Sequence, residues 1–221
     1  MTLLDAGEGR GFVGDPDRAG LPTALVGLDR TAAEYPRATF VAGLRAVLRG
    51  LGVDPDGPDV ADTPDRVLRA LREMAKGYGE DPAVHLARTF PVDGADGMVL
   101  VRDVPFESLC AHHLLPFSGR AAIAYIPAAG QPVVGLSKLA RVLDVYAHRL
   151  QTQEQIGVQV TAALDEHLAP LGSACVLVAQ HGCMAHRGVR KAGASMVTSS
   201  LTGVFRNDPA ARAEFMALAG A

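Results

Sequence analysis

Two short segments rich in cysteine and histidine constrain the fold most strongly. They are Cys110-Ala-His-His113 and, far downstream, His181-Gly-Cys183. Thiols and imidazoles are the usual ligands of transition metals, so a shared ion would require the fold to bring the two segments together. Cys110 and His113 are one helical turn apart, and both can lie on the same face of a helix. His181 and Cys183 are two residues apart, so in an extended segment both leave the same face.

Cys110, His113 and Cys183 form a set of three ligands that suits Zn²⁺. His112 lies about 100° around such a helix from His113, so it points poorly toward the same ion. His112 and His181 would then be free imidazoles beside the metal. Three protein ligands with an open fourth position are typical of a catalytic zinc, which lowers the pKa of bound water to about 7. The pattern therefore predicts an open catalytic site rather than a closed structural one.

A closed structural zinc would need a fourth protein ligand, and Cys175 is the only other cysteine. It lies in the apolar run 174–179, which favours a small buried thiol with no special role. Three unevenly placed cysteines make no disulfide framework. Metal-bound thiolates fit a reduced, cytoplasmic setting better.

Length and composition exclude several classes of protein. The chain has 221 residues, enough for one substantial domain with a real core. A hydrophobic content of 48% and a net charge of −3 indicate neither disorder nor general nucleic-acid binding. No segment has the unbroken apolar length of a membrane span, and residues 1–10 do not resemble a signal peptide. We therefore expect a cytoplasmic protein without membrane or nucleic-acid partners.

The N-terminal part is predicted to be a tail followed by helices. Residues 1–35 are rich in Gly, Asp, Arg and Pro without periodicity, which indicates a mobile tail. Region 36–92 should be helical, because apolar residues recur at helical spacing over 38–52. A second helix should begin at Thr63-Pro64, with Thr63 as its N-cap, and end at Gly77.

Region 93–221 should be the catalytic domain. Strands are expected at 98–101, 121–126, 173–181 and about 194–205. Ser137 and Thr152 can cap two successive helices at about 138–150 and 153–168, and a short helix begins at Pro209. The predicted class is α+β, an antiparallel sheet with a helix pair on one face and an N-terminal helical extension.

An anion-binding site is predicted at the first of these two helices. Ser137 lies at its N-terminus, Lys138 in its first turn and Arg141 one turn on. Backbone N–H groups, a hydroxyl, the helix dipole and two cations together favour a phosphate group. Ordinary solvated side chains are the alternative.

Three further arginines could add positive charge. Arg187 follows Cys183 by four residues, which brings a guanidinium close to the metal. Arg66 and Arg69 lie on one face of the second helix, where either alone would more simply be a solvated surface residue. A polyphosphate substrate would explain this concentration of cations in a slightly acidic chain.

Gln151-Thr-Gln-Glu154 stands at the start of the next helix. A glutamate in a first turn usually only interacts with the helix dipole. A buried Glu154 could instead accept hydrogen bonds from the ring N–H and exocyclic amine of guanine, a pair that adenine does not offer. The residue alone leaves both interpretations open.

Together these motifs resemble GTP cyclohydrolase I, from about Phe40 to Phe205. The resemblance lies in Cys110-Ala-His-His-Leu-Leu-Pro-Phe117, Tyr125-Ile-Pro127, Gly135-Leu-Ser-Lys138 with Arg141, Gln151-Thr-Gln-Glu154, His181-Gly-Cys-Met184, Arg187-Gly-Val189, Asp62-Thr-Pro-Asp-Arg66 and Met98-Val-Leu-Val-Arg102-Asp103.

The resemblance implies the tunnelling fold and a toroidal homo-oligomer, typically a decamer, with active sites between subunits. It implies hydrolysis of GTP to 7,8-dihydroneopterin triphosphate with release of formate, at the start of pterin and tetrahydrofolate synthesis, without an organic cofactor. The implied roles are zinc ligands for Cys110, His113 and Cys183, acid/base groups for His112 and His181, guanine contacts for Glu154 and Gln153, and triphosphate contacts for Ser137, Lys138, Arg141, Arg187, Arg66 and Arg69.

One position departs from the family pattern. Members normally carry glutamate between the metal cysteine and the histidine pair, and this chain has Ala111. The ligands and both imidazoles are retained. Two alternatives remain: a divergent paralogue with another product or pathway, and a catalytically silent member that binds nucleotide or partner proteins.

Overall fold

The computed structural model describes residues 37–92, 94 and 97–220. The tail predicted for 1–35 lies outside the described residues. The division between 36–92 and 93–221 stays a prediction. Within the described residues, no helix has both the length and the apolar character needed to cross a bilayer.

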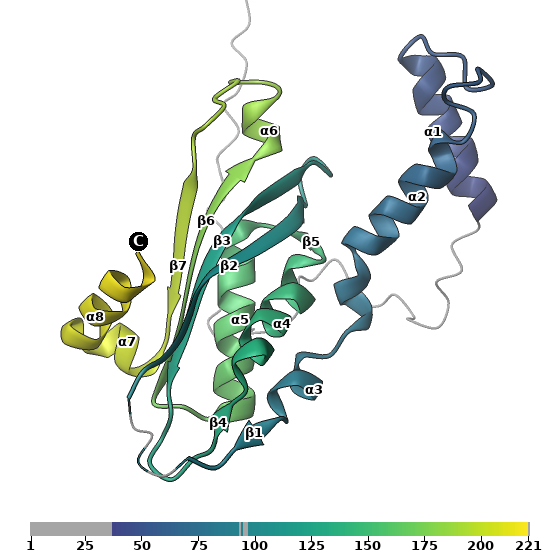
Figure 1. Cartoon of the computed structure of the whole chain (residues 1–221). Helices are drawn as coiled ribbons and strands as arrows, with labels where there is room; N and C mark the ends of the chain where they lie inside the picture. Colours follow the sequence, from purple (N-terminus) through teal and green to yellow (C-terminus); the bar gives the residue numbers. More distant parts are fainter. Residues whose placement is uncertain (1–36, 93, 95–96, 221) are drawn as a thin grey trace, which may run out of the picture. The chain divides into compact units, whose positions relative to one another are not determined.

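A five-stranded sheet forms the centre of the fold, in the order β5-β2-β3-β6-β7 (Figure 1). Its strands are β2 (Val99–Cys110), β3 (Pro116–Ile126), β5 (Leu150–Gln151), β6 (Gly172–His181) and β7 (Met196–Leu201). The four long strands pair antiparallel, as predicted. β5 adds a short parallel pairing to the end of β2, which makes the sheet mixed. The strand predicted to run to 205 ends at Leu201, because helix α7 begins at Gly203.

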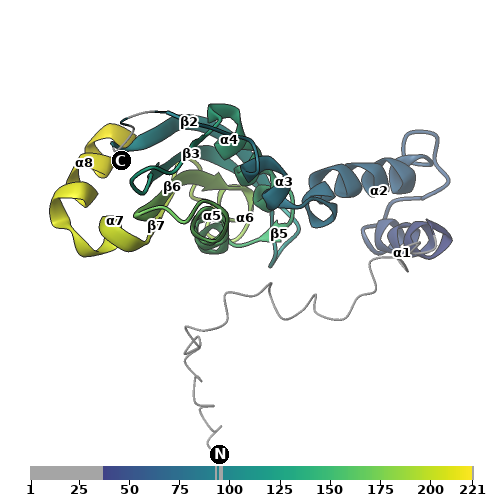
Figure 2. The same cartoon turned by 90° about the horizontal axis from the view of Figure 1, so that it is seen from below.

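The predicted helix pair covers one face of the sheet. It consists of α4 (Leu136–Ala147) and α5 (Gln153–Leu168), which pack on β2 and on β6 and β7 respectively (Figure 2). Ile123 and Tyr125 of β3 point into this core, while Ala122 and Ala124 alternate to the other face. The class α+β is therefore confirmed, in the arrangement that the tunnelling fold implies.

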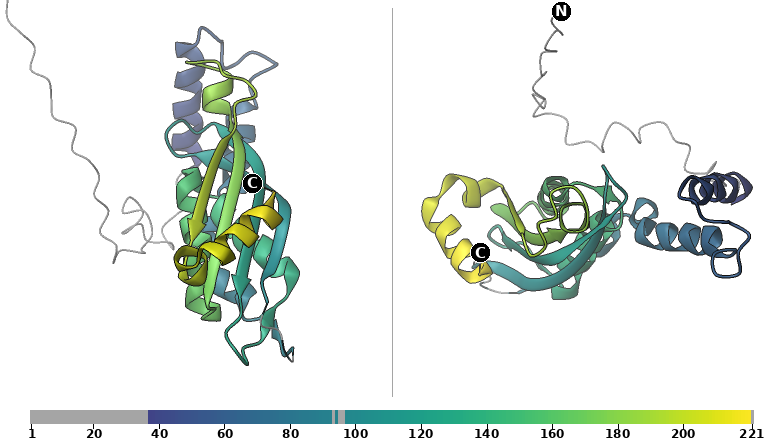
Figure 3. Two further views of the ribbon diagram at one scale, coloured as in Figure 1. Left: turned by 90° about the vertical axis from the view of Figure 1, so that its left-hand side faces the viewer. Right: turned by 90° about the horizontal axis from the view of Figure 1, so that it is seen from above.

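Two C-terminal helices pack on the opposite face. They are α7 (Gly203–Asn207) and α8 (Pro209–Ala219), shown in yellow in Figure 3. Phe205 and Phe215 are fully buried there, with ring centroids 5.5 Å apart. α8 begins at the predicted Pro209, where the Asp208 side chain accepts a hydrogen bond from Ala210 N.

Two predicted helix caps shift and one is confirmed. α4 begins at Leu136 with Gly135 as its N-cap, because the Gly135 carbonyl accepts the first helical bond from Lys138 N. Ser137 lies inside the first turn and does not cap the helix. Thr152 caps α5 as predicted, by accepting from Gln155 N at 3.4 Å.

The N-terminal helices are α1 (Arg37–Gly50) and α2 (Thr63–Met74), which pack on each other. The Arg37 guanidinium binds both carboxylate oxygens of Asp65, at 2.5 and 2.6 Å. Thr63 is already helical, and the N-cap is Asp62, whose carbonyl accepts from Arg66 N. The cap predicted at Thr63 was therefore wrong by one residue.

A short helical turn, η2 (Lys76–Gly79), joins α2 to the rest of the fold. Gly77 N donates to His148 O at 2.9 Å, and Arg149 Nε donates back to Gly77 O at 3.1 Å. The buried Arg149 guanidinium also lies over the rings of Tyr146 and Tyr78, 4.8 and 5.7 Å from their centroids. These contacts fix η2 against the C-terminal end of α4. Next, α3 (Pro82–Leu86) packs on α4 and α5, and β1 (Thr89–Phe90) pairs with β4 (Val133–Val134).

Gly77→Ala is expected to lower the free energy of unfolding by about 3 kcal/mol, because overpacking forces backbone shifts. A Cβ at Gly77 would overlap Val145 O and lie 2.8 Å from His148 O. Gly79→Ala in the same turn is the matched control, since nothing lies within 4 Å of its Cβ position. Urea unfolding followed by circular dichroism would measure both variants, and equal stabilities would contradict the steric argument.

Candidate functional site

The first ligand segment forms the turn between β2 and β3. β2 ends at Cys110, whose carbonyl accepts hydrogen bonds from His113 N at 3.2 Å and Leu114 N at 2.9 Å. Leu114 then adopts a left-handed conformation, with φ 54°, and the chain returns along β3. His113 thus lies one tight turn beyond Cys110, as the spacing predicted, although the turn does not continue as a helix.

The second ligand segment begins where β6 ends. β6 lies beside β3, with His181 opposite Phe117, and the short helix α6 (Gly182–Ala185) follows at once. A Cβ on Gly182 would lie 2.8 Å from Pro116 O, so glycine allows α6 to approach the start of β3 closely. The prediction that Cys183 shares an extended segment with His181 was wrong, because Cys183 lies in this helix.

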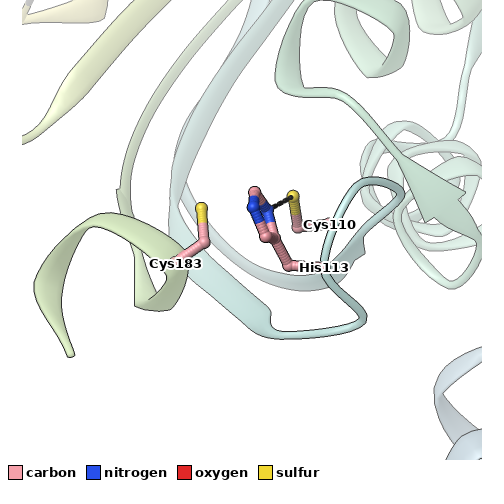
Figure 4. Close-up of side chains that lie close together, drawn as sticks. All are labelled: Cys110, His113 and Cys183. Carbon is pink, nitrogen blue, oxygen red and sulfur yellow. Dashed lines mark hydrogen bonds between the residues drawn. The ribbon is translucent and has the colours of Figure 1, made fainter. Parts of the chain in front are cut away.

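These two segments bring three donor groups together. The ligand atoms of Cys110, His113 and Cys183 all lie within 4.8 Å of one another (Figure 4). Cys110 Sγ lies 3.6 Å from His113 Nδ1 and 3.9 Å from His112 Nδ1. Over the described part of the chain, no other cluster of three Cys, His, Asp or Glu side chains could hold a metal ion.

The chemistry of this group fits a zinc ion. Burial raises the pKa of Cys183, and the neighbouring Cys110 thiol raises it further. A divalent cation between the two sulfurs would offset both effects by stabilising thiolates. Cys110 is buried whereas His113 is exposed, so one side of the group remains accessible.

Cys175 plays no part in this group. Its side chain is fully buried in β6, and burial raises the pKa of its thiol to about 12. A buried thiol with so high a pKa is a small core residue rather than a ligand or nucleophile. The predicted buried thiol is confirmed.

The two remaining imidazoles lie in different surroundings. His112 is exposed, with its ring centroid 6.2 Å from that of His113. His181 is half-buried, and its ring stacks on Phe117 with centroids 4.4 Å apart and planes 4° apart. Burial lowers the pKa of His181, and the charge of Glu154 acts in the opposite direction.

Glu154 and Gln153 stand at the start of α5 but differ in burial. Glu154 is exposed in the chain and close enough to act on His181. Gln153 is 1% exposed, and its amide nitrogen donates inside the chain. Its oxygen lies 2.9 Å from His181 Nε2. A side chain occupied in this way does not fit the predicted contact with guanine. No local signal predicts this burial, since a glutamine in a first helical turn is ordinarily solvated.

The predicted anion site lies away from the metal group within one chain. α4 is about 18 Å long at the usual helical rise. Its C-terminal end leads into β5, which pairs with Leu109 and Cys110. Ser137 and Lys138 lie at the opposite end, next to β4 (Figure 1). The structure therefore does not bring them to Cys110.

The four arginines are divided in the same way. Arg187 follows α6, and its charge acts on Cys183. Arg141 lines a cavity of about 310 Å³ together with Asp144, Glu80 and Asp81. On α2, Arg66 lies 3.4 Å from Asp62, and Arg69 is close to Asp65. Of these side chains, Arg187 is the one that a single chain places beside the metal group.

Known proteins are similar to this chain over most of its length. The sequence model of the family described as GTP cyclohydrolase I matches residues 40–220. A protein of Synechococcus sp. (strain JA-2-3B'a(2-13)), named GTP cyclohydrolase 1, is 48% identical over 99% of this chain and 97% of its own. A protein of the same name from Sinorhizobium fredii is 45% identical over 86% of this chain and 93% of its own. A third, from Synechococcus sp. (strain JA-3-3Ab), is 42% identical over 99% and 97%.

Proposed function

This chain belongs to the GTP cyclohydrolase I family, and from that premise we propose that it hydrolyses GTP to 7,8-dihydroneopterin triphosphate and formate. The reaction opens pterin and tetrahydrofolate synthesis in the cytoplasm. The observation that carries the proposal is the convergence of Cys110, His113 and Cys183 within the segment that the family model matches.

The Cys110, His113 and Cys183 side chains would hold a zinc ion. When bound, the ion supplies an acidified water molecule for hydrolysis, because zinc lowers the pKa of its water to about 7. His112 and His113 are on the exposed side of the group and would face the purine. The three donors themselves take no part in proton transfer.

Proton transfer falls to His112 and His181. Opening the imidazole ring of guanine requires a proton at the ring nitrogen whose bond to C8 breaks, and a positioned imidazole provides general acid–base catalysis. Glu154 lies near His181. Its carboxylate can accept hydrogen bonds from the ring N–H and exocyclic amine of guanine, which orients C8 toward the metal group.

The triphosphate requires more cations than Arg187, the one member of the predicted set that a single chain places near the metal group. Arg187 is near Cys183, whereas Ser137, Lys138, Arg141, Arg66 and Arg69 lie on α4 and α2. A second copy that presents its α4 start would complete the pocket, with backbone N–H groups and Lys138 on the phosphates. We therefore propose that the protein forms a toroidal homo-oligomer, typically a decamer, as its resemblance to the family implies.

The alternative of a catalytically silent member rests on Ala111. Its backbone N donates to Gln151 O at 2.9 Å and its side chain is exposed, so the missing carboxylate would have stood at the open side of the metal group. The acidified water, the two imidazoles and Glu154 do not depend on that carboxylate. We expect the wild-type chain to release formate from GTP at a rate that Ala111→Glu raises by about 10²-fold, because an auxiliary carboxylate contributes a few kcal/mol.

Formate detection and mass spectrometry of the products test this expectation. His112→Ala is the inactive control, because it removes a proton-transfer group and leaves all three donors in place. If the wild-type chain is as inert as His112→Ala while Ala111→Glu is active, the silent alternative replaces the proposal. A different pterin product would instead identify a divergent paralogue.

A further inference from the structure

Gln153 has an environment unlike that of a substrate-binding side chain. It is the first residue of α5 and is 1% exposed. Its Nε2 donates to Leu177 O at 3.0 Å and Met196 O at 3.0 Å, and lies 3.1 Å from Thr198 Oγ1. The amide therefore ties α5 to the neighbouring strands β6 and β7.

These partners fix which way the amide points. The carbonyl oxygens of Leu177 and Met196 can only accept hydrogen bonds, so they require the NH₂ end of Gln153. The Oε1 end is then directed at His181 Nε2, 2.9 Å away. An amide oxygen only accepts, so the hydrogen of this bond must belong to Nε2. The neutral form of His181 consequently carries its hydrogen on Nε2 and a lone pair on Nδ1.

A second contact fixes the plane of the same ring. Phe117 is 1% exposed and stacks on His181 with planes 4° apart. Tilting the imidazole would break this stacking, and a half-turn within the same plane would break the bond to Gln153. Among the described residues, no hydrogen bond occupies Nδ1. That nitrogen is left for other partners.

We propose that Gln153 is a positioning residue, which holds His181 as the Nε2–H tautomer so that protons are exchanged with substrate through Nδ1. Nε2 keeps its hydrogen throughout, while Nδ1 gains or returns one proton. This role rests on the proposed cyclohydrolase function and replaces a direct contact between the Gln153 side chain and guanine.

The tautomer can be measured without activity. Full-length, zinc-loaded protein would be labelled with ¹³C,¹⁵N-histidine, and His181 would be assigned by the loss of its signals in His181→Gln. One-bond couplings in solid-state spectra identify which ring nitrogen carries hydrogen. In wild type we expect hydrogen on Nε2 of the neutral ring. Hydrogen on Nδ1 alone would overturn the proposal, and this experiment needs no variant of Gln153.

Kinetics separate positioning from base binding. Gln153→Leu removes the acceptor, and Gln153→Glu keeps an acceptor for Nε2–H but loses the donors to the two carbonyls. We expect kcat to fall about 10²-fold in Gln153→Leu with little change in KM, and Gln153→Glu to recover part of that loss. A purely structural role predicts that Gln153→Glu is no better, because a buried carboxylate faces two carbonyls. Thr198→Val, which leaves both carbonyls and Oε1 in place, should retain the wild-type kcat.

The outcomes are distinguishable. A raised KM with unchanged kcat in Gln153→Leu would show a guanine contact instead and reject the positioning role. If wild type releases no formate, the proposed function fails, while the labelled histidine still decides whether Gln153 sets the tautomer.

Discussion

Cys183→Ala is expected to be purified with less than about a tenth of the zinc found in wild type, and with no measurable release of formate. Two protein donors, Cys110 and His113, would remain, and sites with so few donors hold zinc weakly. The wild-type protein should carry about one zinc per chain. Elemental analysis after dialysis against a weak chelator measures both values.

Cys175→Ala provides the matched control, because it also removes one thiol. Cys175 is buried in β6, outside the donor group, so this variant should lose some stability and keep its zinc. Full zinc in Cys183→Ala would refute the ligand assignment. Zinc lost equally from both variants would point to general unfolding instead.

Glu154→Gln should reduce kcat/KM for GTP by roughly 10²–10³-fold, far more than the change in size suggests. One acceptor oxygen becomes a donor that faces a donor on guanine, and an unpaired polar group in a binding site is costly. Inosine triphosphate lacks the exocyclic amine, so the variant should also lose most of the preference for GTP over inosine triphosphate.

Glu166→Gln makes the same chemical change on the same helix. Glu166 is exposed in the last turn of α5, so this variant should keep the wild-type kcat/KM. Normal turnover of GTP by Glu154→Gln would mean that another group recognises guanine. The ratio of the two substrates would then be unchanged as well.

The longer helices and parts of the long strands could be predicted because their signals are local, although β2 and β3 extend well beyond the predicted 98–101 and 121–126. Apolar periodicity gave α1 within a few residues, and the predicted Thr152 cap gave the start of α5. Ser137 failed as a cap because Gly135 was already extended and its carbonyl took the first helical bond. The type of side chain does not reveal at which of several neighbouring residues the backbone becomes helical. β5, only two residues long, carried no periodic signal at all.

The candidate site was predictable only in part, for a related reason. The ligand types and spacing predicted all three donors, Cys110, His113 and Cys183, and the pairing of β3 with β6 is what brings Cys183 to the other two. The surroundings of His181 depend on strand register, which sets Phe117 beside it, and on the buried end of α5, which supplies Gln153. Likewise, the local sequence at the start of α4 indicates a positively charged helix start, but it does not predict where in the fold Lys138 lies.

The short parallel pairing of β5 has a thermodynamic consequence. It joins Cys110 to Gln151, and a further bond runs from Ala111 N to Gln151 O, three residues before Glu154. These backbone contacts thus connect the turn that follows Cys110, which would hold the metal, with the start of α5, which would hold the base. A bound ion that immobilises this turn would lower the conformational entropy that α5 loses when it binds guanine, so the ion would strengthen nucleotide binding. By thermodynamic reciprocity, the bound nucleotide would then increase the affinity for the ion by the same coupling free energy. Cofactor retention would then depend on substrate supply.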